Sequence, residues 1–252
     1  MMMCSDELLL GYDYDAWHGY GKKVPIYANI TQGKNRHMLI AGVSGGGKSY
    51  LTNQLMARLL MANGKEQIML FADFKREDAF EYIRGCKNYY YYEQTIEALD
   101  IVYSILHKRQ SGEDKSRIPV TLFFDEYLAA VLALKSKDKK KADKVMMQVA
   151  EILSIGRSLN CTICITTQTA YASVFPEGSR NNFGIIAICG APLRSIYELL
   201  VPREYIDDIV NKNFSIGEGI VLLQGRDMHC IKVPMVKNEE IMKDIIVEGL
   251  NN

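Results

Sequence analysis

The sequence lacks long apolar runs and an excess of charge of either sign. It contains no stretch of about 18 apolar residues, and its Met-rich start is followed by Cys4–Glu7 instead of a basic and then apolar signal. The 30 Lys and Arg residues balance the 30 Asp and Glu residues, so any contact with nucleic acid must be local. We therefore expect a cytoplasmic chain without a leader or a membrane span.

The sequence also lacks a disulfide framework. Its six cysteines are scattered, as expected of thiols in a reducing cytosol. Cys161 and Cys164 have the spacing of a redox motif, but they lie in an apolar, β-branched run. Residues three apart on a strand point to opposite faces of the sheet, so these two are predicted to be buried thiols.

Short apolar runs alternate with helical patterns along the 252 residues, which is typical of βαβ units and a parallel sheet. Helical spacing appears at Leu51, Leu55 and Leu59, and again from Ile96 to Leu106 and from Val145 to Leu153. We predict an α/β fold with a mainly parallel central sheet flanked by helices. The predicted strands are His37–Ala41, Gln67–Asp73, Pro119–Asp125, Cys161–Thr167 and Gly184–Cys189.

Both ends of the chain predict small antiparallel additions. In residues 1–36, Leu8–Leu10 and Val24–Ile30 flank a turn-prone segment at Gly19–Lys22, which indicates a β flap. We predict that residues 37–252 form the main domain, in one structural unit with the flap. This domain would close with a hairpin turning at Gly225 and an amphipathic helix over Glu239–Leu250.

The pattern G-x-x-x-x-G-K-S spans Gly42–Ser49, between a predicted strand and a predicted helix, and indicates a phosphate-binding loop. The glycines allow backbone N–H groups to point at phosphate, and the helix N-terminus adds its positive end. Lys48 should reach the β- and γ-phosphates, and the Ser49 hydroxyl should bind magnesium. We predict Mg-ATP as the ligand, held by Gly42, Val43, Ser44, Gly45, Gly46, Gly47, Lys48, Ser49 and Tyr50.

Two further strands end in polar side chains at the edge where an α/β sheet binds its ligand. Asp125 would hold the magnesium, and Glu126 would polarise the attacking water as general base, as in a hydrolase. Gln168 would orient that water and sense the γ-phosphate. The alternatives are a solvated strand end for the acidic pair and an ordinary polar loop residue for Gln168.

Arg157 ends a predicted helix and leaves two interpretations open. It could stabilise the C-terminal dipole of that helix. It could instead act as an arginine finger in the site of another subunit.

The order of these motifs resembles the motor domain of the FtsK/SpoIIIE and HerA group of DNA-translocating ATPases over nearly the whole chain. Leu8–Asp13 is similar to the lead-in, Phe71–Lys75 to an Asp-Pro-Lys strand end, and Phe124–Tyr127 to the acidic motif. Gly156–Gln168 keeps the spacing from helix-ending arginine to strand-ending Thr-Gln. The resemblance implies a RecA-like P-loop NTPase fold, a homohexameric ring with ATP at subunit interfaces, Arg157 acting across them, and duplex or single-stranded DNA in the pore.

Departures from the motifs of this family indicate which of its members the chain resembles. Phe183–Ile186 replaces the Ile-Pro-Thr-Arg stretch of chromosome-segregation members, and neither a winged-helix module after Leu250 nor a membrane segment before Leu8 is expected. The chain looks closest to the soluble motor of conjugative-element transfer ATPases, also called coupling proteins, or of a phage-borne homologue. Membrane or relaxosome proteins would then be partners that recruit it.

Two segments allow a contact with DNA. The lysines of Lys135–Lys144 could grip phosphates, or form a solvated, disordered loop. Tyr89–Tyr92 could stack on bases, but a partly buried strand is favoured by aromatic β-propensity.

Other nucleotide-binding classes fit less well. A GTPase would need Asn-Lys-x-Asp, a partition protein typically has an early lysine where Val43 and Ser44 stand, and a kinase would not need Glu126. The strongest alternative is a ring ATPase that threads polypeptide or serves secretion, followed by a nucleotide-switched scaffold.

Overall fold

The computed structural model describes residues 6–64 and 66–252. In these ranges ten strands form one sheet in the order β2-β1-β10-β9-β8-β3-β7-β6-β4-β5. The six strands from β8 to β5 in that order are parallel to one another, and the other four are antiparallel to their neighbours. The strands are β1 (Glu7–Asp13), β2 (Pro25–Asn29), β3 (Met38–Gly42), β4 (Ile68–Asp73), β5 (Tyr89–Tyr91), β6 (Val120–Asp125), β7 (Cys161–Thr167), β8 (Ile185–Cys189), β9 (Glu218–Leu223) and β10 (Asp227–Lys232).

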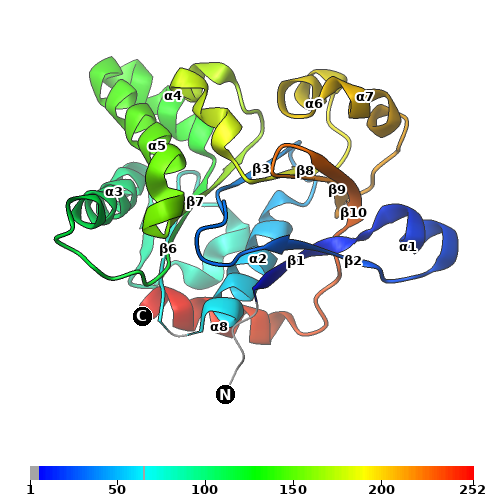
Figure 1. The fold of residues 1–252 in the computed structure, drawn as a ribbon, viewed down its shortest axis with the longest axis horizontal. Helices are drawn as coiled ribbons and strands as arrows, with labels where there is room; N and C mark the ends of the chain where they lie inside the picture. Colours follow the sequence, from blue (N-terminus) through cyan, green and yellow to red (C-terminus); the bar gives the residue numbers. More distant parts are fainter. Residues whose placement is uncertain (1–5, 65) are drawn as a thin grey trace.

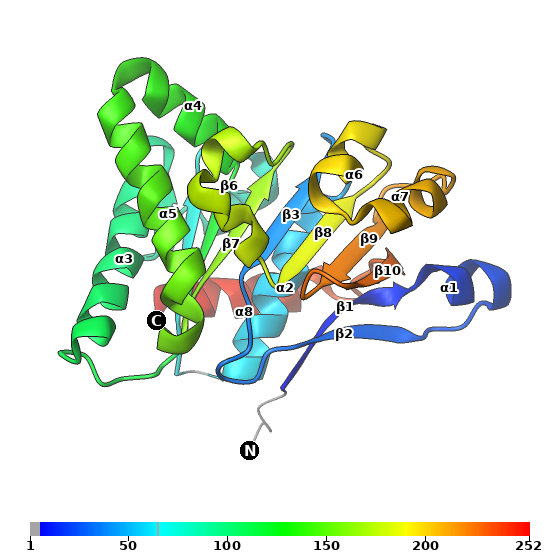
Figure 2. The same cartoon turned by 45° about the horizontal axis from the view of Figure 1, so that its top comes forward.

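Helices cover both faces of this sheet (Figure 1). One face carries α3 (Thr95–Ser111), α4 (Tyr127–Lys137), α5 (Lys139–Leu159), α6 (Arg194–Leu200) and α7 (Arg203–Val210). The other face carries α2 (Lys48–Asn63), α8 (Glu239–Asn251) and the 3-10 helix η1 (Asp78–Ile83). Figure 2 shows α3 and α5 side by side, with α6 and α7 over the β8 and β9 end of the sheet. Among the helices of the described ranges, none has the length and apolarity to cross a membrane.

The predicted parallel core is confirmed. All five predicted strands are present, each within about one residue of its predicted bounds, as β3, β4, β6, β7 and β8. Every residue of β7 is buried, because a central parallel strand is covered on both faces. Cys161 and Cys164 are buried in the two different core clusters, as the alternation of side chains predicted. Tyr89–Tyr91 forms the short edge strand β5, which confirms the strand interpretation of that tyrosine run.

The N-terminal strands are part of the main sheet. β1 pairs with β2, as predicted, but it also pairs with β10, so both strands extend the main sheet. The segment between them contains the helix α1 (Tyr14–Tyr20), where only a turn was expected. The Asp13 side chain caps its first turn, accepting from the Ala16 N–H at 2.8 Å, and Gly21 ends it at φ 62°.

The C-terminal additions follow the prediction. β9 and β10 form an antiparallel hairpin, and β9 also pairs antiparallel with β8. Gln224 and Gly225 both have positive φ in the turn. The helix α8 packs against α2, and its buried residues include Met242, Ile246 and Leu250. The helices α6 and α7 were not predicted.

The lysine-rich segment is helical, so the interpretation of Lys135–Lys144 as a solvated, disordered loop was wrong, while a contact of these lysines with DNA stays a prediction. α4 runs to Lys137 and α5 starts at Lys139, and the two helices pack against each other. Asp138 separates them in an extended conformation, and its carboxylate accepts from the Lys141 N–H at 3.0 Å. Lys137 is ion-paired with Glu93 at 2.8 Å. Helical hydrogen bonding and this cap therefore fix the backbone of the lysine-rich segment.

Because Asp138 caps α5, the substitution Asp138→Ala is expected to lower the free energy of unfolding by about 1 kcal/mol. That loss corresponds to a fall in Tm of roughly 2–4 °C for a domain of this size. Thermal unfolding followed by circular dichroism measures it. Asp143→Ala, at an exposed position inside the same helix, is the matched control. Equal losses of Tm in both variants would mean that Asp138 has no special role as a cap.

Candidate functional site

The predicted phosphate loop connects β3 to α2 and uses glycine where other residues would be strained. Gly42, Gly45 and Gly47 have φ values of 144°, 75° and 99°. A Cβ atom at Gly42 would lie 2.4 Å from the carbonyl oxygen of Cys189, and one at Gly46 would lie 2.8 Å from the same atom. The loop therefore packs directly on the end of β8, which sets its position relative to the sheet.

Lys48 and Ser49 begin α2 and are held by groups of the site itself. The Lys48 ammonium donates to the carbonyl oxygens of Gly42 at 2.9 Å and Val43 at 3.1 Å, so it folds back over the loop. The Ser49 hydroxyl donates to Oε2 of Glu77 at 3.2 Å. Both side chains thus point at the space where a helix N-terminus and a glycine loop bind phosphate.

Asp125 ends β6 and is 3% exposed. The Thr166 hydroxyl donates to its Oδ1, whereas its Oδ2 has no hydrogen-bond partner among the described residues. Burial raises the pKa of Asp125 to about 7, the Thr166 hydrogen bond acts in the opposite direction, and the carboxylates of Glu77 and Asp73 raise it further. A buried carboxylate oxygen without a partner among the described residues, close enough to other carboxylates for them to act on its pKa, fits a hard divalent cation such as Mg²⁺.

Glu126 follows Asp125 in an unusual backbone conformation. Its φ of 53° and ψ of 43° are left-handed, which costs roughly 1–2 kcal/mol for a residue with a side chain. Its N–H donates to the Thr166 hydroxyl oxygen at 3.1 Å, and its carboxylate forms an ion pair with Lys75 at 3.0 Å. The side chain is 5% exposed. Strained residues of this kind are held by their neighbours and cluster at functional sites.

A cavity of about 240 Å³ brings most of the predicted site together. The exposed residue Gln168, just after β7, lines this cavity together with the phosphate loop, and Asp125 is buried at the end of the adjacent strand. Tyr50 also borders it, while its hydroxyl accepts from the Val236 N–H at 2.7 Å. The lining residues are Ser44, Gly45, Gly47, Lys48, Ser49, Tyr50, Lys75, Glu77, Glu126 and Gln168.

Arg157 does not lie in this cavity. It is exposed in the last turn of α5, before β7 begins at Cys161, whereas Gln168 follows the end of the same strand. Seven strand residues span roughly 23 Å at about 3.3 Å each. Arg157 therefore lies near the amino ends of the parallel strands, whereas the phosphate loop follows their carboxyl ends. It is too far away to serve the site of its own chain.

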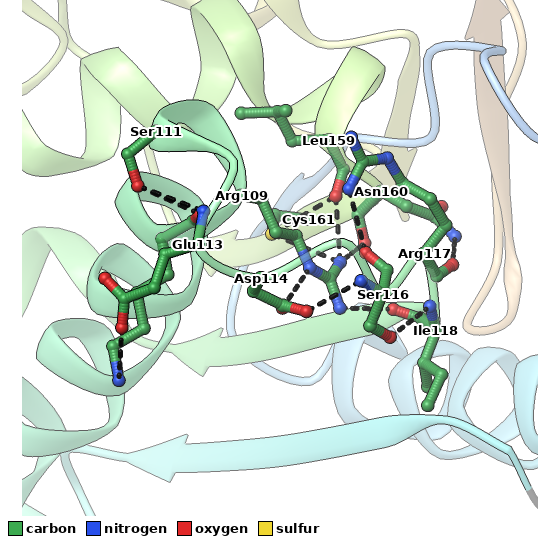
Figure 3. Close-up of polar contacts among 11 residues, drawn as sticks. Arg109, Ser111, Glu113, Asp114, Ser116, Arg117, Ile118, Leu159, Asn160 and Cys161 are labelled. Atoms are coloured by element: carbon green, nitrogen blue, oxygen red, sulfur yellow. Dashed lines mark hydrogen bonds and ion pairs between the residues drawn. The ribbon is translucent and has the colours of Figure 1, made fainter.

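A buried arginine, Arg109, anchors the C-terminal end of α5 at Leu159 (Figure 3). Arg109 is 3% exposed and pairs with Asp114 through Nε at 3.0 Å. It also donates to the carbonyl oxygens of Leu159 and Ile118, each at 2.8 Å. The ends of α3 and α5 and the loop before β6 are thereby joined, which gives Arg157 a rigid base.

Three residues of the site were not among the predicted ones. Lys75 lies in Phe71–Lys75, the segment that is similar to an Asp-Pro-Lys strand end. Its position two residues after Asp73 was the signal that could have placed it in the site. Thr166 directly precedes the predicted Thr167-Gln168 strand end, and its hydroxyl bonds to both the Asp125 carboxylate and the backbone N–H of Glu126. Glu77 gave no signal, because only the turn after β4 brings it to Ser49.

Residues 18–73 match the family described as "Helicase HerA, central domain" (DUF87), which is less than half of the chain. No curated protein matches the sequence.

Solved structures similar to nearly the whole chain include two secretion-type ATPase structures and one conjugation coupling protein. The cytoplasmic domain of the type VII secretion ATPase EccC from Thermomonospora curvata has 17% identity and a TM-score of 0.68, covering 100% of this chain and 32% of that one. EssC (ATPases 2 and 3) from Geobacillus thermodenitrificans has 13% identity and a TM-score of 0.69, covering 99% and 49%. The pCW3 conjugation coupling protein TcpA, with ATPγS, has 17% identity and a TM-score of 0.69, covering 96% and 70%.

The chain thus has the RecA-like fold of P-loop ATPases, with a large, mainly parallel sheet flanked by helices. It spans about a third of the EccC chain and about half of the EssC chain. Identities of this size show a shared fold.

Proposed function

We propose that this chain is the ATP-hydrolysing motor of a ring-shaped translocase that moves DNA. The single observation that supports this best is the cavity where the phosphate loop, Glu126 and Gln168 meet, with Asp125 buried beside it. A nucleotide-switched scaffold would need the phosphate loop but not a buried carboxylate and a neutral amide aimed at the terminal phosphate.

Each group has a distinct task in this proposal. The backbone N–H groups of Gly45–Gly47 and the Lys48 ammonium bind the phosphates once Lys48 leaves the loop carbonyls. Ser49 and Asp125 would hold Mg²⁺, which supplies positive charge to the phosphate oxygens. Glu126 accepts the proton of the attacking water, and Gln168 orients that water.

The distance of Arg157 from its own site supports a ring. An arginine on the opposite edge of the sheet can complete the site of a neighbouring copy, where it would stabilise the charge that develops on the phosphates. We propose a homohexamer with ATP at each interface. The remaining site residues then form half of a site that the adjacent subunit completes.

DNA is the proposed cargo, duplex or single-stranded, in the pore of the ring. The match of residues 18–73 to the HerA central domain and the likeness to TcpA, named as a conjugation coupling protein, support this choice. The proposed process is the transfer of plasmid or other mobile-element DNA. The motor would act in the cytoplasm, or at a membrane to which a relaxosome or membrane protein recruits it.

We expect duplex DNA to raise the steady-state ATPase rate of the purified chain several-fold. DNA that binds in a pore preferentially stabilises the assembled ring, and assembly completes the sites. Phosphate release measured with and without duplex DNA at two salt concentrations tests this, because backbone contacts weaken as salt rises. Heparin is a control for nonspecific polyanion effects. A rate that duplex and single-stranded DNA both leave unchanged would count against a DNA motor.

A secretion ATPase is the second candidate, favoured by the likeness to EccC and EssC over nearly the whole chain. One further EccC structure is described as a complex with a signal sequence peptide. Stimulation of hydrolysis by a peptide and not by DNA would favour this candidate, whereas the reverse result would favour the DNA motor.

A further inference from the structure

Lys75 lies in the nucleotide cavity and is paired with the carboxylate assigned as the general base. Its ammonium is 3.0 Å from Oε2 of Glu126, which is 5% exposed, whereas the Lys75 side chain is 37% exposed. The same cavity contains the phosphate loop and Gln168. The ammonium therefore lies between a buried carboxylate and the space that a terminal phosphate would fill.

The turn after β4 presents Lys75 rigidly. The buried carboxylate of Asp73 accepts from the N–H groups of Arg76 at 2.6 Å and Glu77 at 3.3 Å. Its other oxygen accepts from the Tyr89 hydroxyl at 2.8 Å, which ties the turn to β5. Arg76 has a positive φ of 58°, so the turn is tight. The backbone of Lys75 is thus held on both sides, while its flexible side chain is free to change partner.

The same turn also holds a second group of the site. Glu77 accepts from the Ser49 hydroxyl at 3.2 Å, so one short segment pairs with both Ser49 and Glu126. The Ser49 hydroxyl and the Lys75 ammonium are thus paired with carboxylates of the protein, although both could instead contact a bound nucleotide or its magnesium. A terminal phosphate carries more negative charge than one carboxylate and offers several acceptor oxygens to the three donors of an ammonium.

We propose that Lys75 exchanges Glu126 for the terminal phosphate of a bound nucleoside triphosphate. Before nucleotide binds, Lys75 holds the carboxylate of Glu126; when a triphosphate fills the cavity, the ammonium moves to the phosphate oxygens and leaves Glu126 to contact the water. Lys75 is then a residue that distinguishes triphosphate from diphosphate. This inference rests on the proposed function, because it assigns a role within the same ATP site.

Nucleotide affinities test the exchange. Dissociation constants for ATPγS and ADP with magnesium are measured by competition with a fluorescent nucleotide. For Lys75→Met we expect ATPγS to bind about tenfold or more weakly, because a charged hydrogen bond to phosphate is lost, with ADP within about twofold. Lys75→Arg keeps the charge and should retain most of the preference for ATPγS. Lys108→Met is the matched control, since Lys108 also pairs with a glutamate, Glu113 at 4.0 Å, but on the exposed end of α3.

The ion pair between Lys75 and Glu126 leads to a second, independent prediction, which concerns the affinity of the Glu126→Gln variant for ATPγS. Glu126→Gln removes the competing charge, so ATPγS should bind several-fold more tightly while ADP is unchanged. In the double variant Lys75→Met with Glu126→Gln this gain should disappear, because Lys75 is the group that moves. A double-mutant cycle on ATPγS affinity quantifies the coupling.

Three results separate the possible failures. Equal weakening of ATPγS and ADP by Lys75→Met, or a gain from Glu126→Gln that persists without Lys75, overturns the exchange and leaves the proposed ATPase intact. Failure of the unaltered chain to bind either nucleotide overturns the proposed function itself. Thermal unfolding of each variant shows whether a change in affinity comes from loss of the fold.

Discussion

Glu126→Gln is expected to lower kcat for ATP hydrolysis by about 10²–10⁴-fold while nucleotide stays bound, since that is the usual contribution of a general base. Glutamine keeps the size of the side chain and can still donate or accept a hydrogen bond, but it cannot accept the proton of the attacking water. The groups proposed to bind the phosphates are the glycine loop and Lys48, whose ammonium pairs with the loop carbonyl oxygens of Gly42 and Val43 and not with Glu126. The variant should therefore still bind nucleotide but hydrolyse ATP much more slowly.

Steady-state phosphate release and nucleotide binding on the same preparation measure this separation. Glu93→Gln is the matched control, because Glu93 also pairs with a lysine, Lys137 at 2.8 Å, but its side chain is 69% exposed outside the cavity. Its turnover should stay close to that of the unaltered chain. Unchanged hydrolysis in Glu126→Gln would remove this residue from the mechanism.

Arg157→Ala is expected to lower kcat by about 10³-fold or more if the arginine acts in the site of a neighbouring subunit. Mixing Arg157→Ala chains with Lys48→Ala chains should partly restore hydrolysis. Some interfaces of a mixed ring would combine the intact phosphate loop of one variant with the intact Arg157 of the other. Hydrolysis measured across a series of mixing ratios should pass through a maximum, whereas each variant alone stays inactive.

The alternative role for Arg157 predicts a different pattern. Stabilisation of the C-terminal dipole of α5 needs only a positive charge, so Arg157→Lys would keep it, and Arg157→Ala would lower Tm. An arginine finger needs the planar fork of donors, so Arg157→Lys would lose most of the turnover without a change in Tm. Absence of rescue at every mixing ratio, together with a lower Tm for Arg157→Ala, would favour the helix-end role.

Periodicity was sufficient to predict the central part of the fold. A buried parallel strand must be apolar on both faces, so runs such as Cys161–Thr167 stand out from the helical patterns on either side. The same reasoning predicted that Cys161 and Cys164 face different sides of the sheet, which the two core clusters confirm. These are local properties, and they survive in any tertiary arrangement that buries the strand.

The lysine-rich segment shows where composition misled. A run of lysines is common in solvated loops, and such a loop was one of the two interpretations of Lys135–Lys144. Its helical state depends on the packing of α4 against α5 and on the carboxylate of Asp138 at the junction. Packing of this kind joins residues that no short window of sequence brings together.

Sequence by itself determined the strand, glycine turn and helix start of the proposed phosphate loop, because the strand, the glycines and Lys48-Ser49 are contiguous and phosphate binding needs only that order. It also predicted the strand ends at Asp125, Glu126 and Gln168, although their joint role remains a proposal. Only the tertiary structure decided which groups share the cavity and that Arg157 lies at the far edge. The sheet order places β7 between β3 and β6, and β4 beside β6, so residues such as Lys75 and Glu77 reach the site through long-range strand pairing and not through their local sequence.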